Sequence, residues 1–378
     1  MSAQSDKPRV LVTGAAGFIG ARVVESLYLT GAAEVRAGIR QWSSPGVPRL
    51  ARFPVEIVFC DVMVRDQIEK AIEGVTVIVH SVLGDGKVNI EGTHNLLEAA
   101  KKHGVRRFVH ISTAEVYGEP TGNIAEATPY GYTGSEYGDS KIEAEKLCFE
   151  YSKHGVPVTI LRPSIVYGPF DMMWIVYFAK RLQSGLLGII KGLGEGYCNL
   201  IYIDDLVQGI WLVANHDAAV GEAFNMNGPE IITWNEYFRR LNTALNLPEL
   251  QEISPLRARS KAVLRELTRS LLKFIQSHMN KKLLKRMIGS TRRTAMGRLA
   301  DSASSSLSLA VELRELNHLY RRKAIYVSDK AQRMLNYHPK YDVDTSLQLS
   351  ISWMAHHGMI SRPSEKPGLS TLHGKSHL

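Results

Sequence analysis

The sequence has little cysteine for its 378 residues. Its three cysteines, Cys60, Cys148 and Cys198, form no Cys-x-x-Cys pair, and any pairing leaves one thiol over. This pattern speaks against a disulfide framework, which is typical of secreted domains. We therefore expect a reduced, cytoplasmic protein, and we predict no metal site.

Long hydrophobic runs are also missing. No stretch of 18 apolar residues occurs, so no segment is expected to span a membrane. The amino terminus is polar and lacks the apolar run of a secretion signal. Residues 361–378 are polar, with Pro, Gly and Ser, which predicts a flexible tail.

Acidic residues are scarce in one segment, whose positive charge exceeds the net charge of +9 of the whole chain. Residues 257–298 contain 13 Lys or Arg and only one acid, Glu266, so the rest of the chain is slightly negative. Apolar residues recur there every three to five positions, which predicts basic amphipathic helices. They could pack on a neighbouring lobe, contact anionic lipid at a membrane surface, or bind an acidic substrate or polyanion. Nucleic acid is not expected, because almost no aromatic residues are interleaved with the charges.

What the chain does have is a glycine-rich turn at its amino terminus, Val-Leu-Val-Thr-Gly-Ala-Ala-Gly-Phe-Ile-Gly over residues 10–20. The β-branched run predicts a buried strand, and the turn opens a helix over about residues 16–29. Gly14 permits the tight turn, Gly17 lets the backbone approach a pyrophosphate, and Gly20 lets the helix lie close to the strand. The helix amino terminus would then face the phosphates of a dinucleotide.

The Gly-x-x-Gly-x-x-Gly spacing resembles the extended short-chain dehydrogenase/reductase family, specifically its epimerase/dehydratase-like branch, over residues 8–245. The resemblance implies an α/β fold, a Rossmann doubly wound parallel sheet with a smaller carboxyl-terminal substrate lobe. We expect a nucleotide-binding domain at 8–170 and a substrate lobe at 171–360, interleaved with the sheet. The resemblance also implies that other residues contact the cofactor: Phe18, Ile19, Val62, Ser81 and Ser112.

The choice of nicotinamide cofactor depends on the second strand, which ends at Arg40. An NAD site usually has an acid there to bind the ribose 2′-hydroxyl, but no acid occurs between residues 35 and 55. A guanidinium suits a 2′-phosphate, so the sequence favours NADP, with NAD as the alternative. The resemblance implies that Asp61 meets the adenine ring.

Tyr137 and Lys141 are four residues apart on a predicted helix and therefore share one face. An isolated tyrosine is a poor base, since its pKa is about 10, but a nearby ammonium and a nicotinamide cation favour the phenolate. The resemblance assigns proton transfer to Tyr137 and the ribose contact to Lys141. It assigns to Thr113 the substrate hydroxyl or carbonyl oxygen. Glu115 is a further candidate for catalysis, since a glutamate here acts on a substrate proton in some dehydratases.

The segment 161–169 resembles the one that closes over the nicotinamide, with Pro163 and Ser164 at the carboxamide and the substrate entrance. Three features depart from typical sugar-nucleotide enzymes: Ser164 replaces an asparagine, Cys198 replaces an arginine, and the loop at 81–88 is short. These departures leave the substrate class open.

We interpret the chain as an NAD(P)-dependent enzyme that acts on a hydroxyl or keto carbon of a small molecule. The leading hypothesis is a sugar-nucleotide epimerase or dehydratase. The rival is an NADPH-dependent reductase or an enzyme similar to hydroxysteroid dehydrogenases, acting on a lipid-like or secondary-metabolite substrate at a membrane surface, to which 257–298 would bind. A third reading is a cofactor-binding scaffold without activity. The resemblance also implies a homodimer through helices near 88–102 and 136–153.

Overall fold

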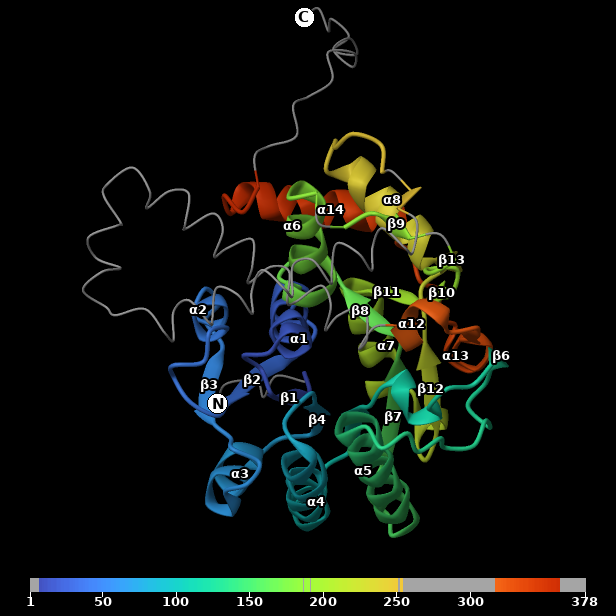
Figure 1. Ribbon diagram of the computed structural model, residues 1–378. Coiled ribbons are helices and arrows are strands. Elements are labelled where there is room, and N and C mark those ends of the chain that lie inside the picture. The colour runs from blue at the N-terminus through green and yellow to red at the C-terminus, as the bar shows by residue number, and fades with distance from the viewer. Residues whose placement is uncertain (1–6, 186, 191, 251, 254–316, 361–378) are drawn as a thin grey trace, which may run out of the picture.

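The computed structural model describes residues 7–185, 187–190, 192–250, 252–253 and 317–360 (Figure 1). The basic segment predicted at 257–298 and the tail predicted at 361–378 lie outside the described residues.

A seven-stranded parallel sheet forms the centre of the fold (Figure 1). Its strands lie in the order β12 (Ala223–Met226), β7 (Val158–Pro163), β5 (Arg107–Ile111), β4 (Val77–His80), β1 (Arg9–Thr13), β2 (Glu34–Ile39) and β3 (Glu56–Phe59). The strand order reverses between β4 and β1, and β1 is paired with both β4 and β2. At such a point a doubly wound sheet opens a ligand crevice beyond the carboxyl ends of its strands.

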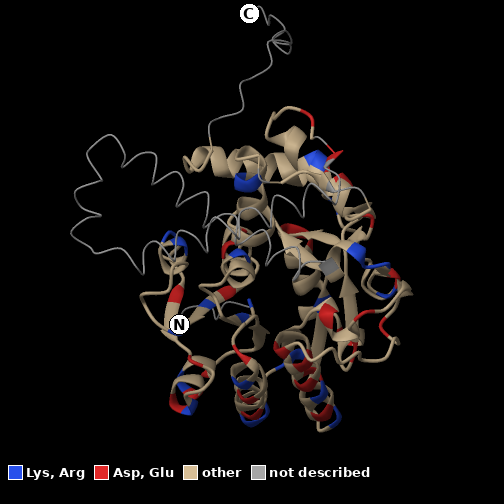
Figure 2. Ribbon diagram, in the orientation of Figure 1, with Lys and Arg blue, Asp and Glu red and all other residues tan. Residues whose placement is uncertain are grey.

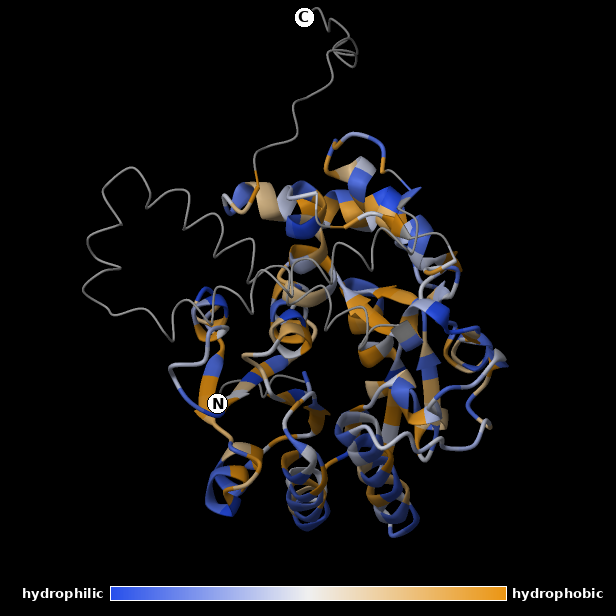
Figure 3. Ribbon diagram, viewed as in Figure 1, coloured by the Kyte–Doolittle hydropathy of each residue, from blue (hydrophilic) through white to orange (hydrophobic). Residues whose placement is uncertain are grey.

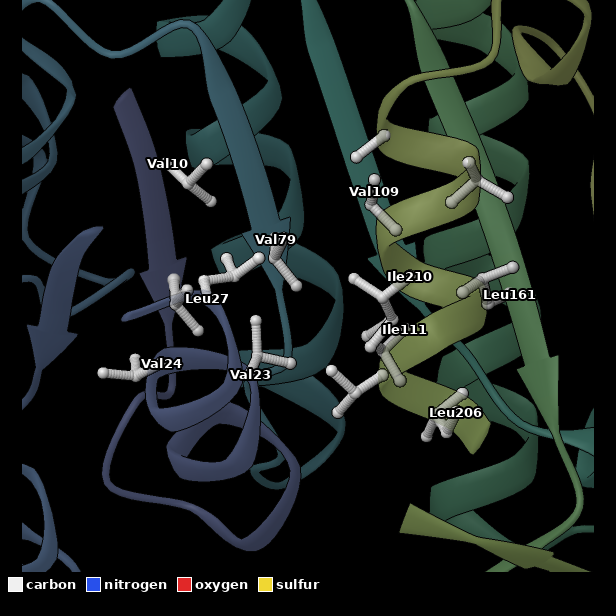
Figure 4. Packing of buried hydrophobic residues seen from close by; sticks show 14 of the residues in the cluster. Val10, Val23, Val24, Leu27, Val79, Val109, Ile111, Leu161, Leu206 and Ile210 are labelled. Carbon is white, nitrogen blue, oxygen red and sulfur yellow. The ribbon is translucent and has the colours of Figure 1, made fainter. Parts of the chain in front are cut away.

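Helices cover both faces of this sheet. On one face lie α1 (Phe18–Leu29) and α7 (Ile203–Ala214). Figure 4 shows Val23 and Leu27 of α1 and Ile210 of α7 in one buried cluster with Val79 and Ile111 of the sheet. Burying each such side chain contributes about 1.5–3 kcal/mol, which fixes these helices on the sheet. On the other face lie α3 (Arg65–Ile72), α4 (Gly86–Lys102) and α5 (Glu136–Lys153).

A second lobe is built mainly from residues after 164. Its core contains Trp234, Tyr237, Phe178 and Leu347, all buried. The helical segments of this lobe are η2 (Met172–Tyr177), α6 (Phe178–Gln183), α8 (Trp234–Ala244), α12 (Asn317–Arg321) and α14 (Val343–His356). Its short strand pairs are β8 (Ile165–Tyr167) with β11 (Leu200–Tyr202), β10 (Tyr197–Cys198) with β13 (Ile232–Thr233), and β9 (Ile189–Ile190) with β14 (Glu252–Ile253).

The remaining elements connect the two parts. Strand β15 (Ala324–Tyr326) returns from the carboxyl-terminal side and pairs with β6 (Gly122–Ile124). The others are short: α2 (Val47–Leu50), η1 (Ala114–Tyr117), η3 (Asp217–Ala219) and α13 (Asp329–Leu335). The nucleotide-binding part and the second lobe are interleaved in sequence. Strand β12 and helix α7 follow residue 171, yet β12 is part of the central sheet and α7 packs on it.

Charged residues are dense on α3, α4 and α5 (Figure 2), whereas the strands of the central sheet are mostly apolar (Figure 3). Among the described helices, none combines the length and the hydropathy needed to cross a bilayer.

Candidate active site

The glycine-rich turn lies between β1 and α1 and leaves space above the helix amino terminus. Gly14 has a φ of +69°, and a Cβ there would lie 2.8 Å from the carbonyl oxygen of Ser81. A Cβ on Gly20 would lie 2.4 Å from the carbonyl oxygen of Gly14. Only glycine therefore fits where turn, helix and β4 meet. The Ser81 hydroxyl donates a 2.8 Å hydrogen bond to the Thr13 carbonyl and holds the end of β4 there.

The amino terminus of α1 is free to bind an anion. Its N-cap is Gly17, so no side chain caps the helix, and its first turn contains no acid. The helix dipole and the exposed backbone N–H groups of this turn favour a phosphate. Phe18 and Ile19 follow directly and line the large cavity described below. The turn therefore fits the pyrophosphate of a dinucleotide.

The predicted adenosine contacts lie at the carboxyl ends of β2 and β3. Arg40 is exposed and has no partner among the described residues. Asp61 accepts a 3.0 Å hydrogen bond from the Met63 backbone, and Val62 is buried beside Gly92. Sequence reasoning missed Trp42, whose exposed ring lies edge-on to that of Phe59, 6.0 Å between centroids. An exposed tryptophan two residues after Arg40 is the signal that could have identified it.

Tyr137 and Thr113 meet across the cavity. Thr113 follows β5 and caps η1, where its hydroxyl accepts a 3.2 Å hydrogen bond from the Glu115 backbone. Tyr137 lies in the first turn of α5 and lines the same cavity as Thr113. Its residue surface is 38% exposed, yet desolvation of the phenol raises the pKa of Tyr137; the Thr113 hydrogen bond opposes this and the charge of Glu115 adds to it.

Lys141 lies behind this pair, one helical turn along α5. Its ammonium is buried and donates a 3.0 Å hydrogen bond to the carbonyl of Ile111 on β5. Burial lowers the pKa of Lys141 to about 8. The expected depression of the Tyr137 pKa by Lys141 is not seen in this structure; a cationic nicotinamide would be needed to favour the phenolate.

A buried polar network, which sequence reasoning missed, holds the end of β5. Glu145 on α5 accepts hydrogen bonds from the Ser112 hydroxyl and from the Arg162 guanidinium, the shortest to Arg162 at 2.6 Å. Glu145 and Arg162 are both buried, and Arg162 also donates to the Tyr117 hydroxyl at 2.8 Å. Although Ser112 lines the cavity, its hydroxyl is thus committed to Glu145. Because Ser112 directly precedes Thr113, its hydrogen bond to Glu145 also connects the Thr113 backbone to α5.

Asn89 organises the loop after β4. It is buried, and its amide exchanges hydrogen bonds with the backbone of Gly84 at 3.1 Å in both directions. Its amide nitrogen also donates to the Ser140 hydroxyl on α5 at 3.0 Å. The helix cap of α4 is Asp85, so Asn89 ties the loop to α5 instead.

Glu115 forms an ion pair with a residue from the carboxyl-terminal part of the chain. Arg322, just after α12, binds the Glu115 carboxylate through both terminal nitrogens, at 2.7 and 3.0 Å. Burial alone would lower the pKa of Arg322, but its hydrogen bonds and attraction to Glu115 raise it. Sequence reasoning missed Arg322, because its 207-residue separation from Glu115 leaves no local pattern.

A cavity of about 580 Å³ brings these groups together. It contains Phe18 and Ile19 from the glycine turn, Pro163 and Ser164 from the end of β7, and residues of the second lobe. The predicted residues that line it are Phe18, Ile19, Ser112, Thr113, Glu115, Tyr137, Pro163 and Ser164. Cys198, where an arginine is usual in sugar-nucleotide enzymes, is fully buried and does not line it.

Comparisons with known proteins agree with this geometry. The family model described as NAD dependent epimerase/dehydratase family matches residues 10–226. The uncharacterized UDP-glucose epimerase YtcB of Bacillus subtilis is 33% identical over 247 residues, which cover 59% of this chain and 77% of that protein. The 3-beta-hydroxysteroid dehydrogenase of Mycolicibacterium neoaurum is 28% identical over 261 residues, 62% of this chain and 70% of that protein.

Solved structures show the same fold. The dTDP-glucose 4,6-dehydratase of Bacillus anthracis, in complex with NAD, has a TM-score of 0.69 at 21% identity, covering 92% of this chain and 97% of that one. The UDP-glucuronic acid 4-epimerase of Bacillus cereus, also with NAD, has a TM-score of 0.67 at 22% identity, covering 92% and 99%. With its glycine turn, switched parallel sheet and matching family model, the chain belongs to the NAD-dependent epimerase/dehydratase family, a family of enzymes within the extended short-chain dehydrogenases/reductases.

Proposed function

We propose that this protein transfers hydride between a nicotinamide cofactor and a hydroxyl or keto carbon, with Tyr137 as the acid/base. The observation that carries this proposal is that Tyr137 and Thr113 line one cavity together with Phe18 and Ile19, which follow the glycine turn. A proton acceptor, an oxygen-binding hydroxyl and the cofactor site thus share one enclosure, as hydride chemistry requires.

The bound nicotinamide would supply hydride transfer, and the protein groups would supply the proton and the orientation. Thr113 would hold the substrate oxygen by its hydroxyl. Tyr137 would take the proton from a substrate hydroxyl, or return it to a carbonyl, through its phenol oxygen. Lys141 would bind the nicotinamide ribose. Phe18, Ile19 and Pro163 would enclose the ring and exclude water.

Replacing Tyr137 with Phe tests this role. We expect the rate of hydride transfer to fall about 100- to 10,000-fold, because a positioned acid/base contributes this much. Cofactor binding should stay within about twofold, since the phenol oxygen is not needed to hold the dinucleotide. Stopped-flow absorbance of the reduced nicotinamide measures the first quantity, and fluorescence titration the second. An unchanged hydride-transfer rate would refute the assignment.

We further propose NADP as the preferred cofactor. The support is Arg40, exposed at the end of β2 without a partner, where its guanidinium can bind a 2′-phosphate. The NAD complexes among the structural neighbours make NAD the alternative for this chain.

Arg40→Asp should weaken NADPH relative to NADH by about 10- to 100-fold, because two charge-assisted hydrogen bonds are lost. Arg106→Asp is the control, since Arg106 is also exposed but precedes β5 at the opposite end of the sheet. The dissociation constants of NADPH and NADH, measured for both variants, give the selectivity. Equal selectivity in the two variants contradicts the preference for NADP.

Two substrate classes fit this chemistry. The UDP-glucose epimerase and the dTDP-glucose 4,6-dehydratase among the relatives favour a sugar nucleotide, on which the cofactor is reduced and reoxidised within one turnover. The second candidate is net oxidation or reduction of a lipid-like or secondary-metabolite substrate, supported by the aromatic lining of the cavity and by the hydroxysteroid dehydrogenases among the relatives. Stoichiometric consumption of bulk NADPH would support the second class, and turnover without net consumption would support the first.

A further inference from the structure

The part of the cavity contributed by the second lobe has an apolar wall. Trp174 and Trp234 pack with ring centroids 5.8 Å apart and both line the cavity. The single indole N–H of Trp234 is already used, since it donates to the Leu319 carbonyl at 3.0 Å. Other apolar or aromatic lining residues are Phe18, Leu83, Ile165, Met173, Tyr197 and Leu319.

The charged groups of the described lining compensate one another. Glu115 and Arg322 form the two-point ion pair, which leaves neither as a free charge. The remaining carboxylate is Asp171, which accepts backbone hydrogen bonds from Met173 and Trp174 at 2.9–3.2 Å. Burial raises the pKa of Asp171 to about 6. Within the described lining, no unpaired cationic Lys or Arg faces the space.

The polar lining groups are similarly occupied by protein partners. The Ser164 hydroxyl donates to Asn227 at 2.7 Å. Asn199 donates to the Ala324 carbonyl at 2.9 Å and accepts from the Tyr326 backbone. The Tyr326 hydroxyl accepts a 2.9 Å hydrogen bond from Arg322. Ser164, Asn199 and Tyr326 thus have protein partners before a substrate enters.

These observations decide which substrate fits best. A nucleoside diphosphate brings two negative charges and many hydroxyls, and burying a polar group without a partner is unfavourable. An apolar ring system is instead stabilised by each part of its surface that is removed from water. It needs only one oxygen, placed where Thr113 and Tyr137 meet.

We propose that the cavity selects an uncharged, largely apolar secondary alcohol or ketone, whose ring system packs on Trp174 and Trp234 and whose single reacting oxygen binds at Thr113 and Tyr137. This rests on the proposed function for its chemistry. It adds the substrate class, which the hydrogen bonds and charges of the lining determine.

Binding tests the proposal without turnover. The full-length protein, with NADH and NADPH both present so that an alcohol has no hydride acceptor, is examined by equilibrium dialysis with three probes: androst-5-en-3β-ol as a neutral polycyclic alcohol with one oxygen, UDP-glucose and dTDP-glucose. We expect the steroid to bind at least about tenfold more tightly than either nucleotide sugar. Tighter binding of a nucleotide sugar, or no steroid binding at the solubility limit, would overturn the proposal.

A pair of variants locates the bound steroid. Trp174→Ala removes part of the aromatic wall and should weaken steroid binding about tenfold. Trp211→Ala is the matched control, because Trp211 is also partly buried but packs on the α7 side of the sheet, outside the cavity. Its effect should stay within about twofold. Equal affinities in the two variants would place the steroid elsewhere and refute the proposal.

This outcome is separate from that of the proposed function. Loss of hydride transfer is measured with Tyr137→Phe, whereas dialysis reports binding alone. A protein that binds nucleotide sugars and transfers hydride would refute the substrate class only. A protein that binds the steroid while Tyr137→Phe keeps its full hydride-transfer rate would refute the assignment of Tyr137 only.

Discussion

Two histidines lie fully buried beneath the active site, and they differ in how their ring nitrogens are satisfied. His80 on β4 has hydrogen bonds to Thr13 at 2.8 Å and to Thr93 at 3.1 Å. His110, on the neighbouring strand β5, has no partner for either ring nitrogen. Burial and the charge of Lys141 lower the pKa of His110 well below its usual value. His110 is therefore held neutral at a cost in hydrogen bonds.

His110→Leu should stabilise the protein most under acid conditions. The histidine binds a proton more readily in the unfolded chain, so wild-type stability falls as the pH drops below about 6.5, by about 1.4 kcal/mol for each pH unit from this one residue. Above that pH the contribution is constant. Urea unfolding at pH 7.5 and pH 5.5 measures the difference. His80→Leu, which removes a hydrogen-bonded ring, is the comparison.

The variant should lose less stability than wild type between these two pH values. If wild type and His110→Leu lost the same amount, the buried ring would not be the group that titrates.

Thr113, Tyr137 and Lys141 could be predicted because each lies within a local motif, at the end of a strand or along one helix face. Arg322 could not, since its role depends on Glu115, 207 residues earlier. The role of Glu145 could not be predicted either, since it depends on a contact with a residue outside its own helix. A glutamate on a charged helix normally faces solvent, and only the burial of Arg162 beside it shows otherwise.

At the scale of secondary-structure elements, the contact between β1 and α1 determines where a dinucleotide can bind. The sequence predicts the first strand with its observed bounds, Arg9–Thr13, and a helix from about 16, which begins at Phe18. The second strand is predicted to end at Arg40, and in the structure it ends one residue earlier, at Ile39. Helix and strand approach closely only because Gly20 has no side chain.

Gly20→Ala should move α1 away from β1, because the new Cβ would lie 2.4 Å from the backbone oxygen of Gly14. We expect a loss of about 1–3 kcal/mol in the free energy of unfolding, together with weaker cofactor binding. Gly138→Ala is the control: it also places a Cβ on a helix, but at an ordinary 3.5 Å from its nearest neighbour.

The control should gain about 0.5–1 kcal/mol, since alanine favours the helix. Chemical denaturation and cofactor titration measure both variants. Wild-type cofactor affinity in a folded Gly20→Ala protein would contradict this account of the turn.

At the scale of the whole molecule, the carboxyl-terminal part of the chain completes the amino-terminal one. Strand β12 extends the central sheet, β15 pairs with β6, and Arg322 reaches Glu115. Helices α4 and α5 pack against each other, where Tyr151 hydrogen-bonds with His94 at 3.0 Å. The homodimer through these helices stays a prediction, as does membrane contact through 257–298.

Deleting residues 257–298 should reduce binding to anionic vesicles. The segment carries 13 of the 46 Lys and Arg residues, and each basic residue near an anionic surface contributes about 1 kcal/mol. Flotation with phosphatidylserine-containing and purely phosphatidylcholine vesicles compares the full chain with the deletion. Cofactor affinity serves as the control for folding. Identical flotation of the two proteins would rule out this segment as the membrane contact.

The sequence by itself determined the family fold and the glycine turn, and it identified Thr113, Tyr137 and Lys141 as the candidate trio. These follow from patterns within a few residues, namely hydrophobic periodicity, glycine spacing and positions one helical turn apart. Only the tertiary structure decided what surrounds that trio. The Glu115–Arg322 pair, the Glu145–Arg162 pair and the aromatic wall join residues that are distant in the chain. Packing alone brings them together, and it pairs the charges of Glu115 with Arg322 and of Glu145 with Arg162.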